Sequence, residues 1–282
     1  MLSLPVIGSI AGSSSQGVSL ADLLTNAINA QGGAWWSGDY GIGLGSAPNI
    51  NTWTPKAQNG ITGDLVGGAP ATGLKPDAST ISTPAGAVDA VKFSGGTVLD
   101  GEEMQHSGIS SLWDDFHKAA GSTIFLVART TGAGNGGFVL DTGGSASNQV
   151  GIAVGFNGGT NRFDFYLADA TGGGDYVALV GLDLDDYSLA PTDLHVYEIA
   201  WSNAGGYSIR VDDENPVTGS LARAPSSAGA AASLVAGSIT AGSVAYLFGE
   251  IVDLALIKGV VGTTERGKIR KALGAKVGIP LA

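Results

Sequence analysis

The chain has 282 residues, of which 46 are glycine and 14% are charged, and its formal net charge is −11. This glycine share, together with 44% hydrophobic residues, favours many short strands joined by tight turns over a disordered chain. Lys and Arg cluster only near the C-terminus, which makes nucleic acid and anionic membranes poor partners, and the lack of cysteine excludes disulfides, thiol catalysis and cysteine-ligated zinc.

The first predicted unit is an N-terminal arm, residues 1–33. Its residues 19–30 (SLADLLTNAINA) predict a short helix that begins after a Ser19 cap and ends at Gly32 and Gly33. An arm too small to hold its own core is typical of a docking or oligomerisation segment, and a helix lying across the main domain is the alternative. No positive charge precedes the first apolar residues, so we expect no Sec signal and synthesis in the host cytoplasm.

The second predicted unit, residues 34–282, reads almost entirely as β-structure. Residues 35–82 are rich in Trp, Gly, Pro and Asn and predict loops with short strands. After them, ten segments bounded by Gly, Asn or Asp predict strands: 88–93, 123–130, 137–140, 150–156, 162–168, 175–180, 194–201, 207–211, 233–239 and 246–257. Many short antiparallel strands indicate an all-β sandwich or barrel.

Alternation within these segments predicts which side chains enter the core. One face of 162–168 is apolar and the other polar: Phe163, Phe165 and Leu167 against Arg162, Asp164 and Tyr166. Residues 202–206 (SNAGG) separate two further strands and predict a hairpin loop. Trp201, at the end of the first of these strands, is expected in the core.

The chain ends in an alternating strand and one short basic helix. In this helix a threonine can act as the cap, Glu265 sits in the first turn, and Gly274 supplies a stop. Ile269 and Leu273 lie four apart on one face. We expect four basic side chains to face solvent: Arg266, Lys268, Arg270 and Lys271.

Four blocks in chain order resemble the concanavalin A-like lectin/glucanase family, in the laminin-G-like jelly-roll form often found in phage virion proteins. They are AWWSGDYGIGLGSAPNINTWTPKAQNG (34–60), DAVKFSGGTVLDG (89–101), STIFLVART (122–130), and HVYEIAWSNAGGYSIRVDD (195–213) with the ending YLFGEIVDLALIKGVVGTTERGKIRKALGAKVGI (246–279). The resemblance covers roughly residues 34–282. It implies a concanavalin A-like jelly-roll β-sandwich with a short N-terminal helical arm and a short C-terminal helix.

Glucanases of this superfamily use two closely spaced carboxylates on one strand, which must point the same way. Here Glu250 and Asp253 are three apart and are predicted on opposite faces, and Glu102 and Glu103 are adjacent. We therefore expect no catalytic residues, and glycosidase activity is the third of the functions considered.

Two acidic runs supply hard oxygen ligands of the kind that calcium requires: Asp183, Asp185, Asp186, Asp212 and Asp213. They lack the twelve-residue calcium-loop spacing, and acidic residues in β-turns commonly cap the turn, so calcium is a possible cofactor and none is required. Among the histidines, His106 and His117 are a candidate metal pair without a third ligand, and His195 is expected as a hydrogen-bonded rim residue.

Four tryptophans could stack on sugar rings: Trp35, Trp36, Trp53 and Trp113. Core packing explains them equally well.

Together these features favour a non-enzymatic virion structural protein, such as a head decoration, spike or fibre subunit at the surface of a phage-like particle. Its expected partners are its own copies, most plausibly in a trimer, and other virion proteins. The alternative is a carbohydrate-binding module that recognises a host surface glycan, and both roles can coexist.

Overall fold

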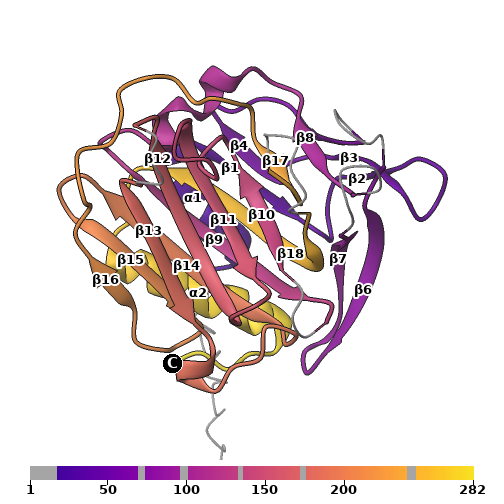
Figure 1. Ribbon diagram of the computed structural model, residues 1–282. Helices are drawn as coiled ribbons and strands as arrows, with labels where there is room; N and C mark the ends of the chain where they lie inside the picture. Colours follow the sequence, from indigo (N-terminus) through magenta and orange to yellow (C-terminus); the bar gives the residue numbers. More distant parts are fainter. Residues whose placement is uncertain (1–17, 69–73, 96–100, 133–135, 172–175, 240–245) are drawn as a thin grey trace, which may run out of the picture.

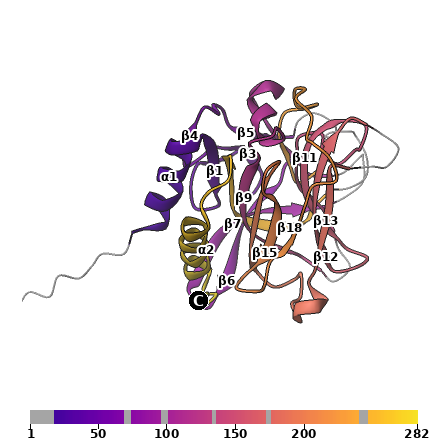
Figure 2. The same cartoon turned by 90° about the vertical axis from the view of Figure 1, so that its left-hand side faces the viewer.

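The computed structural model describes residues 18–68, 74–95, 101–132, 136–171, 176–239 and 246–282. In this part of the chain two antiparallel nine-stranded sheets stack face to face, and two helices cover the outer side of one of them (Figures 1 and 2). The helices are α1 (Leu20–Gln31) and α2 (Thr263–Val277), with two short 3-10 helices, η1 (Ser110–Phe116) and η2 (Asp185–Tyr187). The expected all-β sandwich with an N-terminal and a C-terminal helix is confirmed.

Sheet A is the sheet beneath the helices. Along its main path lie β16 (Val217–Gly219), β15 (Gly206–Val211), β14 (His195–Ser202), β9 (Ser122–Thr130), β18 (Phe248–Lys258), β1 (Gly33–Ser37) and β4 (Ala57–Asn59). Strand β7 (Gly86–Ser94) also pairs with β18, and β6 (Asp77–Thr83) pairs with β7. The predicted hairpin across residues 202–206 joins β14 to β15.

Sheet B forms the opposite layer. Its order is β13 (Ala178–Asp183), β12 (Arg162–Asp169), β11 (Val150–Asn157), β10 (Gly137–Asp141), β17 (Val235–Ala236), β8 (Met104–His106), β5 (Leu65–Gly67), β3 (Ile50–Trp53) and β2 (Ile42–Leu44). The predicted strand 233–239 is shortened to two residues. The predicted strand 175–180 begins at Ala178, and residue 175 lies outside the described residues.

The core has two layers because sheet A is buried on both sides. Between the sheets, Ile124 and Leu126 of β9 lie in one core cluster with Phe163 and Phe165 of β12, whose inward side is the one that the alternation predicts. On the outer side of sheet A, the alternate residue Phe125 packs against the helices. Hence the central strands read as nearly continuous apolar runs, STIFLVART in β9 and FGEIVDLALIK in β18.

Helix α1 follows the sequence prediction. Ser19 is its N-cap and forms a capping box with Asp22, and Gly32 follows its last residue. The apolar stripe, including Leu24 and Ile28, packs into the same cluster as α2, so the helix lies across the main domain. A docking role for residues 1–33 stays a prediction, and residues 1–17 lie outside the described residues.

Helix α2 corrects three expectations. It begins after Gly262 without a side-chain cap, and it ends at Gly278, whose φ of 75° is the left-handed C-cap conformation. Gly274 lies inside the helix, where a Cβ atom would stand 2.7 Å from Leu281, so it is needed for close packing and does not stop the helix. Within the described residues no helix is both long enough and apolar enough to cross a bilayer.

The third correction concerns the basic side chains of α2. Lys268 and Lys271 are exposed as expected, but Arg266 and Arg270 face sheet A. Arg270 donates to Glu198 of β14 at 2.8 Å, and Arg266 forms an ion pair with the other oxygen of the same carboxylate at 3.2 Å. The helix therefore neutralises a carboxylate that would otherwise be buried alone.

Replacing Glu198 by alanine should lower the free energy of unfolding by about 3 kcal/mol, because it leaves Arg266 and Arg270 buried without their carboxylate. Urea denaturation followed by circular dichroism measures the change. The control Glu265→Ala removes a carboxylate that pairs with exposed Lys268 at 3.5 Å and should change it by no more than about 0.5 kcal/mol. Equal effects of the two substitutions would contradict this account of α2.

Candidate functional site

The four tryptophans predicted as sugar platforms are core residues. At most 1% of the surface of each is exposed. Trp36, Trp53 and Trp113 pack between the sheets, and Trp35 packs under the helices. The expectation that they stack on sugar is therefore corrected, since none of these indoles presents a face to solvent. Trp201 lies in the core as expected.

The acidic residues predicted as calcium ligands are already engaged in local contacts. Asp183 accepts from the backbone of Asp185, which itself accepts from Asn161. Asp212 holds the His195 ring at 2.7 Å, and Asp213 lies 3.5 Å from Arg270.

Asp186 is exposed at the start of η2. Across the described residues no three His, Asp or Glu side chains come together to hold a metal ion. Four of the five side chains are engaged with neighbouring groups, so calcium stays an expectation for which the described residues supply no ligand cluster.

Each of the three histidines forms a hydrogen bond within the fold. His195 is 5% exposed and is bonded to Asp212, which agrees with a hydrogen-bonded rim residue. His117 bonds the carbonyl of Ala228, and His106 accepts from Gly108. His106 and His117 are not part of a metal cluster in the described residues.

The prediction that Glu250 and Asp253 lie on opposite faces of β18 is wrong. A β-bulge between Ile251 and Asp253 inserts one extra residue, Val252, relative to β9. Ile251 and Leu254 both enter the core between the sheets, so Glu250 and Asp253 share the outer face. Glu250 is bonded to Arg129 at 2.8 Å and to Ser79 at 2.9 Å.

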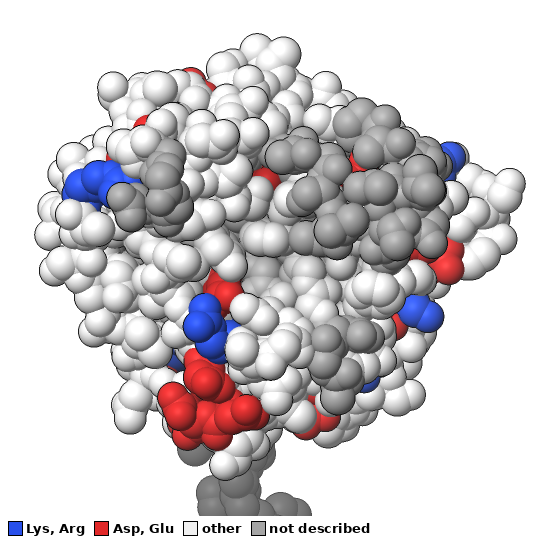
Figure 3. Space-filling view, in the orientation of Figure 1, with Lys and Arg blue, Asp and Glu red and all other residues white. Residues whose placement is uncertain are grey.

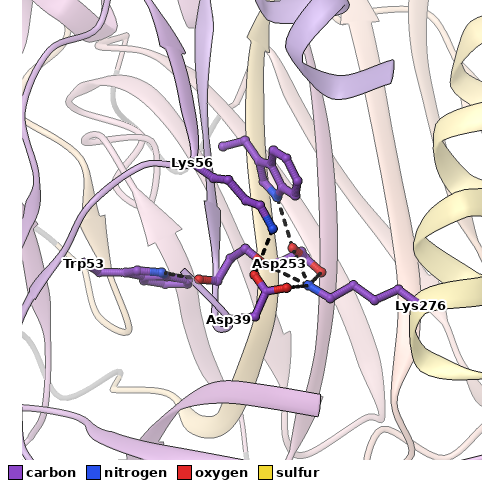
Figure 4. A network of polar contacts seen from close by, with 7 residues as sticks. Asp39, Trp53, Lys56, Asp253 and Lys276 are labelled. Atoms are coloured by element: carbon purple, nitrogen blue, oxygen red, sulfur yellow. Dashed lines mark hydrogen bonds and ion pairs between the residues drawn. The ribbon is translucent and has the colours of Figure 1, made fainter. Parts of the chain in front are cut away.

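Asp253 lies at the centre of a polar network beneath α2 (Figure 4). Its carboxylate accepts from Trp35 Nε1 at 3.0 Å and from Lys276 Nζ at 2.9 Å. Lys276 also approaches Asp39 at 3.5 Å, and Lys56 pairs with Asp39 at 3.1 Å.

Burial raises the pKa of Asp253 above its ordinary value although Lys276 opposes the shift. A perturbed carboxyl of this kind often marks an active site. Here Asp253 is 1% exposed and lies beneath a helix, so its carboxylate fastens α2 to sheet A and is not accessible to a substrate.

The outer face of sheet B carries the most promising surface. Both helices lie on the far side of sheet A, so no described α-helix covers this face (Figure 2). Three aromatic rings follow one another across it and form what we call the aromatic row: Phe138, Tyr166 and Tyr176. The ring centroids of Phe138 and Tyr166 are 5.4 Å apart, and those of Tyr166 and Tyr176 are 5.5 Å apart.

The backbone register explains this placement. Tyr166 alternates with the buried Phe165 and Leu167 and therefore points outward. Its cross-strand partners are Ala153 on one side and Leu179 on the other, and the next outward position of β11 is Gly155. The small residues of β11 leave room for the neighbouring rings, and a Cβ atom at Gly155 would stand 3.3 Å from the Phe138 ring. All three rings are half-buried.

A pocket of about 270 Å³ continues the aromatic row at the edge of the sandwich. It lies between the edge strand β13 of sheet B and the edge of sheet A, and eight residues line it: Tyr176, Val177, Ala178, Leu179, Val180, Tyr207, Ser220 and Ala222. Its volume is close to the lower end of the range for small-ligand sites, about 300 Å³. Two other surface pockets have no aromatic residue in their lining.

Ion pairs border the aromatic row. Arg162 reaches Asp164 at 2.8 Å across Gly181, where a Cβ atom would collide with the guanidinium. Tyr166 donates to the other oxygen of Asp164 at 3.2 Å. Burial and the neighbouring Asp164 raise the pKa of the Tyr166 phenol, which therefore stays protonated and remains a donor at neutral pH.

Sequence reasoning missed this site although part of the signal was visible. The alternation in 162–168 places Tyr166 on the polar face, and an aromatic ring on a polar strand face is a mark of a binding surface. The sequence favours the tryptophans as sugar-stacking residues, because indole rings offer a larger flat surface than phenol rings. Phe138 and Tyr176 become neighbours of Tyr166 only through strand pairing and ring contacts that the sequence does not show.

No protein-family model matches the chain, and no curated protein matches its sequence. Among solved structures, the binding domain of botulinum neurotoxin DC in complex with SialylT matches with a TM-score of 0.57 at 10% identity, covering 87% of this chain and 52% of that one. A botulinum neurotoxin type C structure, whose cell entry depends on two ganglioside molecules, gives 0.58 at 10% identity, with 88% and 52% covered.

A Trypanosoma rangeli sialidase with sialic acid gives a TM-score of 0.50 at 10% identity, covering 90% of this chain and 37% of that one. The chain thus spans about half the length of the toxin domains. At this identity the likeness shows that the β-sandwich fold is shared, and it assigns no residue.

The pair formed by Arg223 and Asp169, beside the aromatic row, gives a pH prediction. Two hydrogen bonds from Arg223 hold the pKa of Asp169 at about 2, below its ordinary 3.8. The folded-state pKa is the lower one, so the pair stabilises the fold above about pH 4 and loses this contribution as the pH falls toward 2.

Carboxyl ¹³C titration by NMR should show that the pKa of Asp169 rises toward 3.8 in Arg223→Met and stays near 2 in the control Arg162→Met. An unchanged Asp169 pKa in Arg223→Met would show that the pair does not cause the shift.

Proposed function

We propose that this protein is a non-enzymatic carbohydrate-binding domain that holds a glycan on the outer face of sheet B. The observation that carries the proposal is the aromatic row, which leads into the 270 Å³ edge pocket on a sheet face that no described helix covers. Aromatic rings suit the flat apolar faces of pyranose rings. Phenol, carboxylate and guanidinium groups beside them can pair with sugar hydroxyls.

Two further features support binding without catalysis. Glycoside hydrolysis requires two carboxyl groups on either side of the scissile bond. The lining of the edge pocket contains no carboxylate. Glu250 and Asp253 now share a strand face, but they are 6% and 1% exposed and are bound by Arg129 and Lys276.

The matched structures support the same class of function. Those of the toxin domains are described with SialylT or with gangliosides, and the T. rangeli enzyme is described with sialic acid. These descriptions concern whole chains of which this protein matches a part, so they favour glycan binding by this fold and do not identify the sugar.

Substituting Tyr166 by alanine should weaken glycan binding about tenfold or more, because it removes the central ring of the aromatic row. Binding is first detected on a glycan array and then measured by isothermal titration calorimetry with the glycan found. Tyr176→Ala should have a similar effect, since this ring belongs both to the aromatic row and to the edge pocket.

The matched control is Tyr40→Ala, which removes an exposed tyrosine that contacts Lys56 and lies outside both the aromatic row and the edge pocket. It should leave affinity within about twofold. Full affinity in both Tyr166→Ala and Tyr176→Ala would place the glycan elsewhere.

A narrower proposal concerns the setting in which the domain acts. The sequence features predict display on the surface of a phage-like particle, with the domain facing outward and residues 1–33 contacting neighbouring subunits. The matched structures named here are described as toxins and an enzyme, so they do not bear on this setting. Genes for capsid or tail proteins beside this one would support it.

The same setting predicts a homotrimer. Size-exclusion chromatography with light scattering should give three times the chain mass of 28.1 kDa. Removal of residues 1–17 keeps the Ser19 cap of α1 and should convert the trimer to a monomer if the arm makes the contacts. A monomeric 282-residue chain would count against the particle role and leave the proposal of glycan binding unaffected.

A further inference from the structure

Few basic side chains lie near the candidate site, and every Lys and Arg of the chain belongs to the described residues. The chain has 14 Lys and Arg residues, and none falls in the segments outside the described part. Within strands β10 to β13, which carry most of the aromatic row, Arg162 is the single basic residue. The edge pocket has none in its lining. Arg223, which follows β16 in the chain, is the other cation bonded to this part of sheet B.

Both guanidinium groups are already committed to carboxylates. Arg162 gives two hydrogen bonds to Asp164, at 3.0 and 2.8 Å. Arg223 holds Asp169 through both oxygens, at 2.6 and 2.9 Å. A ligand carboxylate could reach only the N–H donors that these aspartates leave free, and it would then lie beside an aspartate of like charge.

The surroundings of the aromatic row are acidic or neutral. In Figure 3 the described part of this face is mostly uncharged, with a group of acidic side chains at its lower edge, basic ones just above them, and further charged side chains, including a basic group at the left, toward its margins. Asp164 and Asp169 lie on β12 itself, and Asp183, Asp185 and Asp186 follow at the end of β13. An anionic sugar approaching this surface meets like charge, which disfavours association.

We propose that the site takes neutral glycans and discriminates against sialylated or uronate-containing ones. This inference rests on the proposed function and narrows its substrate class. The glycan chemistry therefore differs from the sialic acid named with the sialidase. The hydroxyl groups of a neutral sugar suit this surface, because they can form hydrogen bonds with its carboxylates and tyrosine hydroxyls while the ion pairs stay intact.

The test compares glycans that differ by one charge. Lactose-terminated glycans and their sialyllactose-terminated counterparts, together with other matched neutral and acidic pairs, are placed on one array. In 50 mM salt we expect each acidic member to bind at least tenfold more weakly than its neutral partner. Equal or tighter binding of the acidic members would overturn the proposal, whereas no binding of any glycan would overturn the proposed function instead.

Salt dependence tests the electrostatic cause. Raising the salt from 50 to 500 mM screens exposed charges. The affinity for neutral glycans should change by less than twofold, and the gap between neutral and acidic members should narrow. A gap that salt does not change would contradict charge as the reason for the selectivity.

A pair of substitutions tests whether the ion pair with Asp169 keeps Arg223 from binding acidic glycans. Asp169→Asn removes the carboxylate that holds Arg223, and Asp186→Asn makes the same change of charge at an exposed position without an ion-pair partner among the described residues. We expect Asp169→Asn to shift the ratio of acidic to neutral binding toward acidic glycans by at least threefold more than Asp186→Asn does. Equal shifts would overturn the role of the Arg223 pair, and the salt series decides the case if Asp169→Asn does not fold.

Discussion

Strands β9 and β18 bury apolar side chains on both of their faces, and the arrangement of the molecule depends on this constraint. One face of sheet A must pack against sheet B, and the other needs a separate cover. Helices α1 and α2 supply that cover and pack into a second apolar cluster. Because the helices are used on sheet A, the outer face of sheet B stays free of helices in the described residues, and the aromatic row lies there.

A two-sided core also has to accommodate the carboxylates carried by its strands. Glu198 and Asp253 both lie on the outer face of sheet A, and each receives a cation from α2. This explains why an acidic chain concentrates basic residues in its last helix. Arg266, Arg270 and Lys276 act as counter-charges inside the fold, and only Lys268 and Lys271 belong to the surface.

The sequence predicts most of this architecture because alternation is a local property. Nearly every long strand was located, and the core side of β12 was assigned correctly. The failures are non-local. The bulge at Val252 reverses the expected relation of Glu250 and Asp253 and is visible only in the pairing with β9. Trp35 is buried in a cluster with Ile269 and Leu273 of α2, which is distant from it in sequence, and the edge pocket combines residues 176–180, 207, 220 and 222.

The position of β18 has a consequence for the timing of folding. This late strand is the only described link between the block of β9, β14, β15 and β16 and the block of β1, β4, β6 and β7. During synthesis the early strands of sheet A therefore wait for residues 248–258 before they can join the rest of the sheet, and such long-range pairing slows folding. Until then their apolar faces are exposed, which favours association between chains that are still being made.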